Sequence, residues 1–222
     1  MSLDKNKIDK ELGYRVSDYL KSKCVETPFK ENNLTDNEKK QKIKKSFIDI
    51  METLGLDLSD DSLRDTPDRV SHMFVNEIFW GLKPENFPKI TTVENKMNYD
   101  SMIVEKNVTV QSNCEHHFIV IDGIAHVAYI PKDKVLGISK INRLVEYFAK
   151  RPQIQERLTE QVFYALEYIL ETSDIAIMID AKHYCVKSRG VEDESSETVT
   201  SKMGGVFKSD KHIRKEFFEM IR

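Results

Sequence analysis

Hydrophobic residues in the first part of the chain recur at helical spacing. Apolar positions on one helical face run through residues 8–20, 43–54 and 66–81, and polar residues fill the positions between them. Glycines at the ends of the second and third stretches are typical helix stops. The pattern therefore predicts a helical segment over residues 1–95, followed by a second domain over residues 96–222.

The second part of the chain has the alternation and β-branched content of strands. Residues 102–113 predict one strand, and residues 118–131 predict a strand, a turn at Asp122–Gly123 and another strand. Residues 174–186 and 197–207 also predict strands. Strands joined in this hairpin-like manner favour an antiparallel sheet.

Two amphipathic helices separate these groups of strands. The first is predicted to begin at Ser139, as its N-cap, and to end before Pro152. The second runs through residues 154–169. Consecutive helices between hairpin-like strands predict an α+β fold, with the helices on one face of the sheet.

The composition excludes several classes of protein. The chain has 222 residues and a net charge of −3, so a general nucleic-acid-binding surface is not expected. Its longest apolar run, Ile175–Ile179, is far shorter than the roughly 18 residues that span a membrane. The polar N-terminus lacks the apolar core of a signal peptide, and three separated cysteines form no disulfide framework. We therefore expect a cytoplasmic protein with neither nucleic acid nor membrane as partner.

The stretch SNCEHHFIV concentrates side chains that bind metals. Two residues separate Cys114 from His117, a spacing at which both can reach one ion. On a strand, His183 and Cys185 would point to the same side. Thiolates and imidazoles together favour Zn²⁺. If Cys114, His117 and Cys185 hold the ion, His116 and His183 remain beside it as acid–base groups.

Other interpretations of these residues stay open. Cys114 and His117 alone are a weak signal that could arise by accident, whereas the second cluster at residues 183–185 favours a metal. A Cys114–Cys185 disulfide could form under oxidation, although the expected compartment argues against it. His126 lies in a predicted strand, and we expect it to pack rather than to act in catalysis.

Basic residues gather at two places that suit an anion. Ser139, Lys140 and Arg143 lie at the start of a predicted helix, where backbone N–H groups and the helix dipole favour anions. Arg189 follows the predicted metal strand closely. Together they predict a phosphate site near the metal, and the alternative is that each is an ordinary solvated charge.

Gln155 and Glu156 open the second of the two predicted helices. A carboxylate in a first turn is ordinary complementation of the helix dipole. It can instead accept two N–H hydrogen bonds from a purine edge. The pattern alone does not choose between these roles.

Four stretches of the chain resemble GTP cyclohydrolase I of the bacterial, zinc-dependent type. They are TPDRVSHMFVNEIFWGL, CEHHFIVIDG, AHVAYIPKDKVLGISKINRLVEYFAKRPQIQERLTEQ and HYCVKSRGVEDESSETVTSKMGG. The resemblance implies the tunnelling fold, in which an antiparallel four-stranded sheet carries two helices on one face, behind extra N-terminal helices. It also implies a homodecamer of two stacked pentamers, with active sites at subunit interfaces.

The resemblance also assigns roles to individual positions. Cys114, His117 and Cys185 match the zinc ligands, and His116 and His183 match the catalytic histidines. The matching substrate contacts are Glu156 and Gln155 for guanine, and Ser139, Lys140, Arg143, Arg189 and Arg69 for the triphosphate. Of these, Arg69 would reach the substrate from a neighbouring subunit.

The implied reaction converts GTP and water to 7,8-dihydroneopterin triphosphate and formate, the first step of tetrahydrofolate biosynthesis. Zinc-activated water attacks carbon 8 of guanine, and His183 is expected to donate a proton to nitrogen 7. The ribose then undergoes an Amadori-type rearrangement, in which Ser139 and His116 are expected to move protons.

Three competing interpretations predict different residues. A nitrile reductase of the queuosine pathway has the same fold, but that family lacks this zinc triad and uses a nucleophilic cysteine with a nicotinamide cofactor. A zinc nucleoside deaminase would show His–X–Glu and Pro–Cys–X–X–Cys, and neither is present. A structural-zinc binding module would need a fourth protein ligand and would show no turnover.

Overall fold

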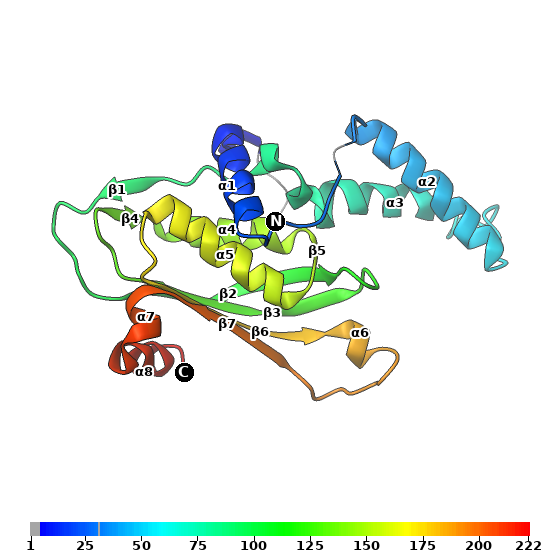
Figure 1. Cartoon of the computed structure of the whole chain (residues 1–222). Helices are drawn as coiled ribbons and strands as arrows, with labels where there is room; N and C mark the ends of the chain where they lie inside the picture. Colours follow the sequence, from blue (N-terminus) through cyan, green and yellow to red (C-terminus); the bar gives the residue numbers. More distant parts are fainter. Residues whose placement is uncertain (1–4, 31) are drawn as a thin grey trace.

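The structure, a computed structural model, describes residues 5–30 and 32–222 (Figure 1). The chain is an α+β protein that begins with three α-helices: α1 (Lys10–Ser22), α2 (Asp36–Thr53) and α3 (Thr66–Met73). They confirm the helices predicted from the apolar spacing. The third changes into a π-helical turn at Phe74–Ile78 before it ends.

α2 and α3 pack against each other and extend away from the rest of the chain (Figure 1). A capping box starts α2, because Thr35 Oγ1 accepts from the Glu38 backbone N–H and the Glu38 carboxylate accepts from the Thr35 N–H. α1 instead lies on α5 and on a 3₁₀ turn. The 3₁₀ turns are Lys5–Lys7, Trp80–Leu82 and Pro84–Asn86.

The main sheet has five strands in the order β5–β2–β3–β6–β7. Their bounds are β2 (Ile103–Cys114), β3 (Val120–Tyr129), β5 (Pro152–Gln153), β6 (Ile175–His183) and β7 (Thr198–Met203). Four of them pair antiparallel, but β5 runs parallel to β2. The expected antiparallel four-stranded sheet is therefore wrong, since the sheet is mixed. The helix before β5 returns the chain to the sheet in the direction of β2.

The turn predicted at Asp122–Gly123 is also wrong, because both residues lie inside β3. Asp122 pairs with Gln111 on one side and with Lys182 on the other. A Cβ at Gly123 would lie only 2.2 Å from the Asp180 carbonyl oxygen, so this glycine permits close approach of β6. Pairing on both sides of the strand overrides the local turn preference.

Helices α4 (Ile138–Ala149) and α5 (Gln155–Leu170) cover one face of the sheet, as predicted (Figure 1). Gly137 is the N-cap of α4, so the prediction that Ser139 caps this helix is wrong. The opposite face carries α7 (Gly205–Ser209) and α8 (Lys211–Met220) at one end. The remaining elements are α6 (Tyr184–Lys187) and a small antiparallel pair, β1 (Thr92–Glu94) and β4 (Lys134–Leu136).

Among residues 5–30 and 32–222, no helix is both long enough and apolar enough to cross a membrane.

Candidate metal centre and substrate site

Cys114, His117 and Cys185 form one compact group, as the sequence predicted. Each offers one donor atom, and the three donor atoms lie within 4.8 Å of one another. Cys114 ends β2, His117 lies in the turn between β2 and β3, and Cys185 lies in α6. The donors are two sulfurs and an imidazole nitrogen, a set that suits zinc and leaves one position of a tetrahedral site open.

Backbone hydrogen bonds close the turn that presents His117. The Cys114 N–H donates to the Ile119 carbonyl and the Phe118 N–H donates to the Cys114 carbonyl, both at 2.8 Å. Phe118 takes a left-handed conformation, with φ of 54°, which reverses the chain. Its ring packs edge-on against Phe74 and Phe79. The turn is thereby attached to the segment that follows α3.

Cys185 reaches the group by a route that the sequence did not predict. β6 ends at His183, and Cys185 belongs to the helical turn α6, so the two residues do not alternate along one strand. The pairing of His183 with Ile121 brings the end of β6 beside the start of β3. Burial raises the pKa of the Cys185 thiol, and the neighbouring Cys114 thiol raises it further.

The two candidate catalytic histidines have different surroundings. His116 is exposed, and its Nδ1 lies 3.7 Å from Cys114 Sγ. His183 is half-buried, and its Nε2 lies 2.8 Å from Gln155 Oε1. Burial lowers the pKa of His183, against an opposing effect of the Glu156 carboxylate. His183 therefore occupies the more constrained position.

The two residues predicted to contact guanine are not equivalent. Glu156, the second residue of α5, is exposed. Gln155, the first residue, is 1% exposed, and its Nε2 donates to the carbonyls of Ile179 and Thr198. Glu156 is therefore accessible to a ligand, whereas the Gln155 side chain is held inside the protein.

The residues predicted to contact phosphate lie in three places. Arg189 Nη1 lies 2.5 Å from His117 Nε2, directly beside the metal group. Ser139 and Arg143 line a cavity of about 820 Å³ between β2 and α4, and the lining of this cavity includes none of the three metal-group residues. Lys140 is half-buried beside them on α4. Arg69 is exposed on α3 and pairs with Asp65 at 3.8 Å.

The structure adds an ion pair to which the sequence assigned no role. Arg157 Nη1 on α5 lies 2.5 Å from Glu115 Oε2, in the turn that carries the histidines. Glu115 Oε1 in turn lies 3.8 Å from His116 Nε2. The two partners are 42 residues apart, so no local pattern could have indicated their contact.

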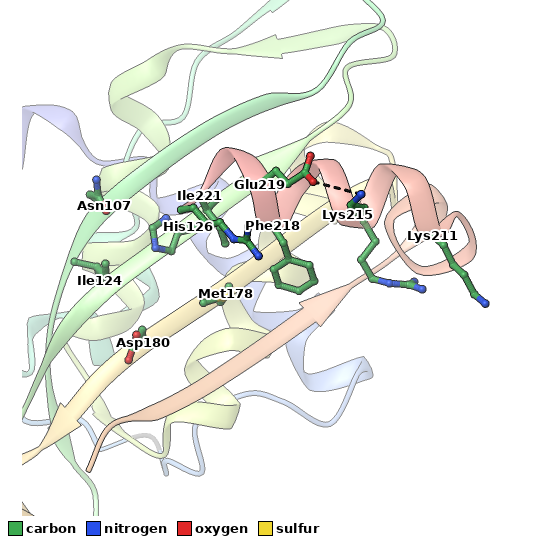
Figure 2. A pocket seen from close by; sticks show the side chains of 12 residues that line it. Asn107, Ile124, His126, Met178, Asp180, Lys211, Lys215, Phe218, Glu219 and Ile221 are labelled. Atoms are coloured by element: carbon green, nitrogen blue, oxygen red, sulfur yellow. Dashed lines mark ion pairs between the residues drawn. The ribbon is translucent and has the colours of Figure 1, made fainter. Parts of the chain in front are cut away.

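A second cavity, of about 740 Å³, lies between the sheet and α8 (Figure 2). His126 lines it and is 4% exposed, as expected for a packed residue. Its Nδ1 is buried and has no hydrogen-bond partner among the residues that the structure describes. None of the predicted site residues lines this cavity, so it is separate from the candidate site.

Comparison with known proteins shows the family of the chain. Residues 43–222 match the family described as GTP cyclohydrolase I. The chain belongs to the GTP cyclohydrolase I family. The matched range contains the metal group and every predicted substrate residue, including Arg69.

Individual GTP cyclohydrolase I relatives match nearly the whole chain. GTP cyclohydrolase 1 of Vibrio campbellii is 53% identical over 207 residues, which cover 93% of this chain and 95% of the relative. That of Aeromonas salmonicida is 55% identical over 198 residues, covering 89% and 91%. A solved structure, the archaeosine synthase QueF-Like in the apo form, has a TM-score of 0.38 and 19% identity, covering 47% of this chain and 96% of that one.

Proposed function

We propose that this chain is an enzyme that converts GTP and water to 7,8-dihydroneopterin triphosphate and formate, the first step of tetrahydrofolate biosynthesis. One observation supports this proposal most directly: a chain of the GTP cyclohydrolase I family brings together Cys114, His117 and Cys185. A structural-zinc module would need a fourth protein ligand. Among the described residues, the group has only three members.

The donor set fits zinc better than a hard cation. Cys114 and Cys185 supply sulfur and His117 supplies an imidazole nitrogen, whereas magnesium and calcium prefer oxygen. When zinc is bound there, it supplies Lewis acidity and makes water a nucleophile near neutral pH. The two cysteines and the histidine would hold the ion and leave room for the reacting atoms.

The surrounding residues bind and orient the substrate. The exposed Glu156 carboxylate can accept two N–H hydrogen bonds from the guanine edge, and the side chain of Gln155, next to it in the chain, is buried. The triphosphate would be bound by Ser139, Lys140, Arg143, Arg189 and Arg69. Positive charge near the metal group comes from Arg189, which already contacts His117.

His183 is proposed to donate the proton to nitrogen 7 of guanine during ring opening. Its lowered pKa makes the cationic ring a stronger acid toward the purine. Ser139 and His116 are proposed to move protons in the later rearrangement of the ribose. His116 is exposed and next to Cys114, so it is free to contact the substrate.

The assembly is proposed to be a homodecamer of two pentamers in the tunnelling fold, with the chain divided into a helical segment (1–95) and a catalytic domain (96–222). β2 pairs with β5 only at Asn113–Cys114, which leaves most of one strand edge without a partner in the described chain. An open edge can continue into a neighbouring subunit. Arg69 is exposed on α3, and it is proposed to reach the substrate of a neighbouring subunit. Cytoplasmic location is part of the same proposal.

A single assay tests the proposed function. The zinc-loaded protein is incubated with GTP, and the product is followed by pterin fluorescence after oxidation and by release of formate. Both products are expected from the wild-type protein and from Cys24→Ser, which changes an exposed cysteine outside the metal group. Cys185→Ser is expected to form neither. Absence of pterin from the wild-type protein would exclude the function, and native mass measurement tests the decamer.

A further inference from the structure

The orientation of the Gln155 amide follows from its acceptors. Its Nε2 lies 3.0 Å from the Ile179 carbonyl oxygen and 2.7 Å from the Thr198 carbonyl oxygen. A backbone carbonyl can only accept a hydrogen bond. The amide nitrogen must therefore face β6 and β7, and the amide oxygen must face His183.

A chain of hydroxyl groups supports the same orientation. Thr159 Oγ1 donates its only hydrogen to the backbone carbonyl of Gln155, at 2.9 Å. The Thr200 hydroxyl, 2.7 Å away, must then donate to Thr159. Thr200 Oγ1 is left as an acceptor for Gln155 Nε2 at 3.2 Å. With the amide reversed, Gln155 Oε1 would face the carbonyl oxygens of Ile179 and Thr198 and the hydroxyl oxygen of Thr200. The three hydrogen bonds that Nε2 donates to these atoms would be lost.

This orientation determines which nitrogen of His183 carries hydrogen. Gln155 Oε1 can only accept, and it lies 2.8 Å from His183 Nε2, so Nε2 must be an N–H donor. In the neutral ring the lone pair is then on Nδ1. We propose that Gln155 is a positioning residue that holds His183 as the Nε2–H tautomer, so that Nδ1 is the atom that exchanges a proton with the substrate.

The proposal rests on the GTP cyclohydrolase I reaction proposed above, and it specifies the path of the proton. The hydrogen on His183 Nδ1 passes to nitrogen 7 of the purine, while the Nε2–H stays bonded to Gln155 Oε1. Gln155 has both amide hydrogens engaged and is 1% exposed, so its contribution passes through His183 and not through direct contact with guanine.

Nitrogen-15 NMR of the solid, sedimented full-length protein tests the tautomer. The zinc-loaded protein is labelled at histidine, and a difference spectrum against His183→Asn identifies the ring of His183. The expected spectrum shows neutral His183 protonated at Nε2. Neutral His183 protonated at Nδ1 overturns the proposal. The spectrum needs no turnover, so its outcome is separate from the pterin and formate assay that tests the function itself.

Kinetics of Gln155→Leu provide the second test. We expect kcat to fall by about 10-fold to 100-fold, part of the roughly 10²–10⁴-fold that general acid–base catalysis contributes, while KM for GTP stays nearly constant. A raised KM at unchanged kcat would instead mean direct guanine binding. Phe217→Leu, in the separate apolar cluster beneath α8, is the control for lost stability. An equal fall in kcat in both variants also overturns the proposal. If Gln155→Leu does not fold, the wild-type spectrum decides alone.

Discussion

We expect the buried ion pair between Arg151 and Glu26 to contribute strongly to the free energy of unfolding. The two side chains are 2% and 7% exposed, and Nη1 lies 2.5 Å from Oε1. Arg151 Nε also donates to the Gly81 carbonyl at 2.7 Å. The guanidinium lies over the rings of Tyr147 and Phe148, at 4.7 and 4.8 Å from their centroids. The pair is thus enclosed and well partnered.

The ion pair is connected to the metal group through the pairing of β5 with β2. Arg151 directly precedes β5, whose residues Pro152 and Gln153 pair with Asn113 and Cys114. The pair therefore ties the segment after α1 to the strand that flanks a metal-group cysteine.

Arg151→Met would leave the Glu26 carboxylate buried without its charge partner. Among the described residues, Glu26 Oε2 has no hydrogen-bond partner, so no contact on that oxygen offsets the loss of Arg151. Removing one member of a buried pair costs roughly 3–5 kcal/mol. For a chain of this size each kcal/mol lowers Tm by about 2–4 °C, so the expected fall is about 6–20 °C.

Urea unfolding followed by circular dichroism, at one protein concentration, measures this loss. The double variant Arg151→Met with Glu26→Leu removes both charges and is expected to recover at least about half of it. Lys215→Met breaks an exposed pair with Glu219, at 3.6 Å, and is the control with little expected change. A loss below about 1 kcal/mol, or a double variant less stable than Arg151→Met, would refute the reasoning.

Three further predictions concern the site and the fold. Cys185→Ser should reduce zinc content from near-stoichiometric to a small fraction, measured by mass spectrometry of the metal; full retention would remove Cys185 from the ligand set. Glu156→Gln should lower kcat/KM for GTP by about 10-fold to 100-fold, because an amide cannot accept both guanine N–H groups. The control is Glu160→Gln, since Glu160 lies on the same helix and its carboxylate pairs with Lys202. Equal values of kcat/KM for the two variants would contradict the role of Glu156. Burial, with Lys106 adding to it, lowers the pKa of His126 from its ordinary value of 6.5. As pH falls, His126 is therefore protonated in the unfolded chain before it is protonated in the folded one, so the free energy of unfolding should decrease from about pH 6.5 toward the lower pKa of the folded state. In urea unfolding, His126→Asn should reduce this dependence of stability on pH. An unchanged dependence would contradict the prediction.

Several features of the site were predictable because they are local. Two residues separate Cys114 from His117, and that spacing alone indicated that they could share an ion. The amphipathic periods of α4 and α5 likewise located two helices and the side of each that faces the sheet.

Other features depend on contacts between distant residues. Nothing near Cys185 indicated that it would enter a helical turn, because the end of β6 depends on its pairing with β3. The turn signal at Asp122–Gly123 failed for the same reason, since hydrogen bonds on both sides of β3 outweigh a local preference. The pairing of Glu115 with Arg157 also joins segments that only the fold brings together.

The sequence by itself thus determined the kinds of element and the chemistry available to them, because periodicity and side-chain type are properties of neighbouring residues. Only the tertiary structure decided which donors meet, how β5 joins the sheet and which groups Gln155 contacts. Burial and hydrogen-bond pairing involve residues far apart in the chain, and a glutamine predicted as a purine contact became a buried link between His183 and two strands.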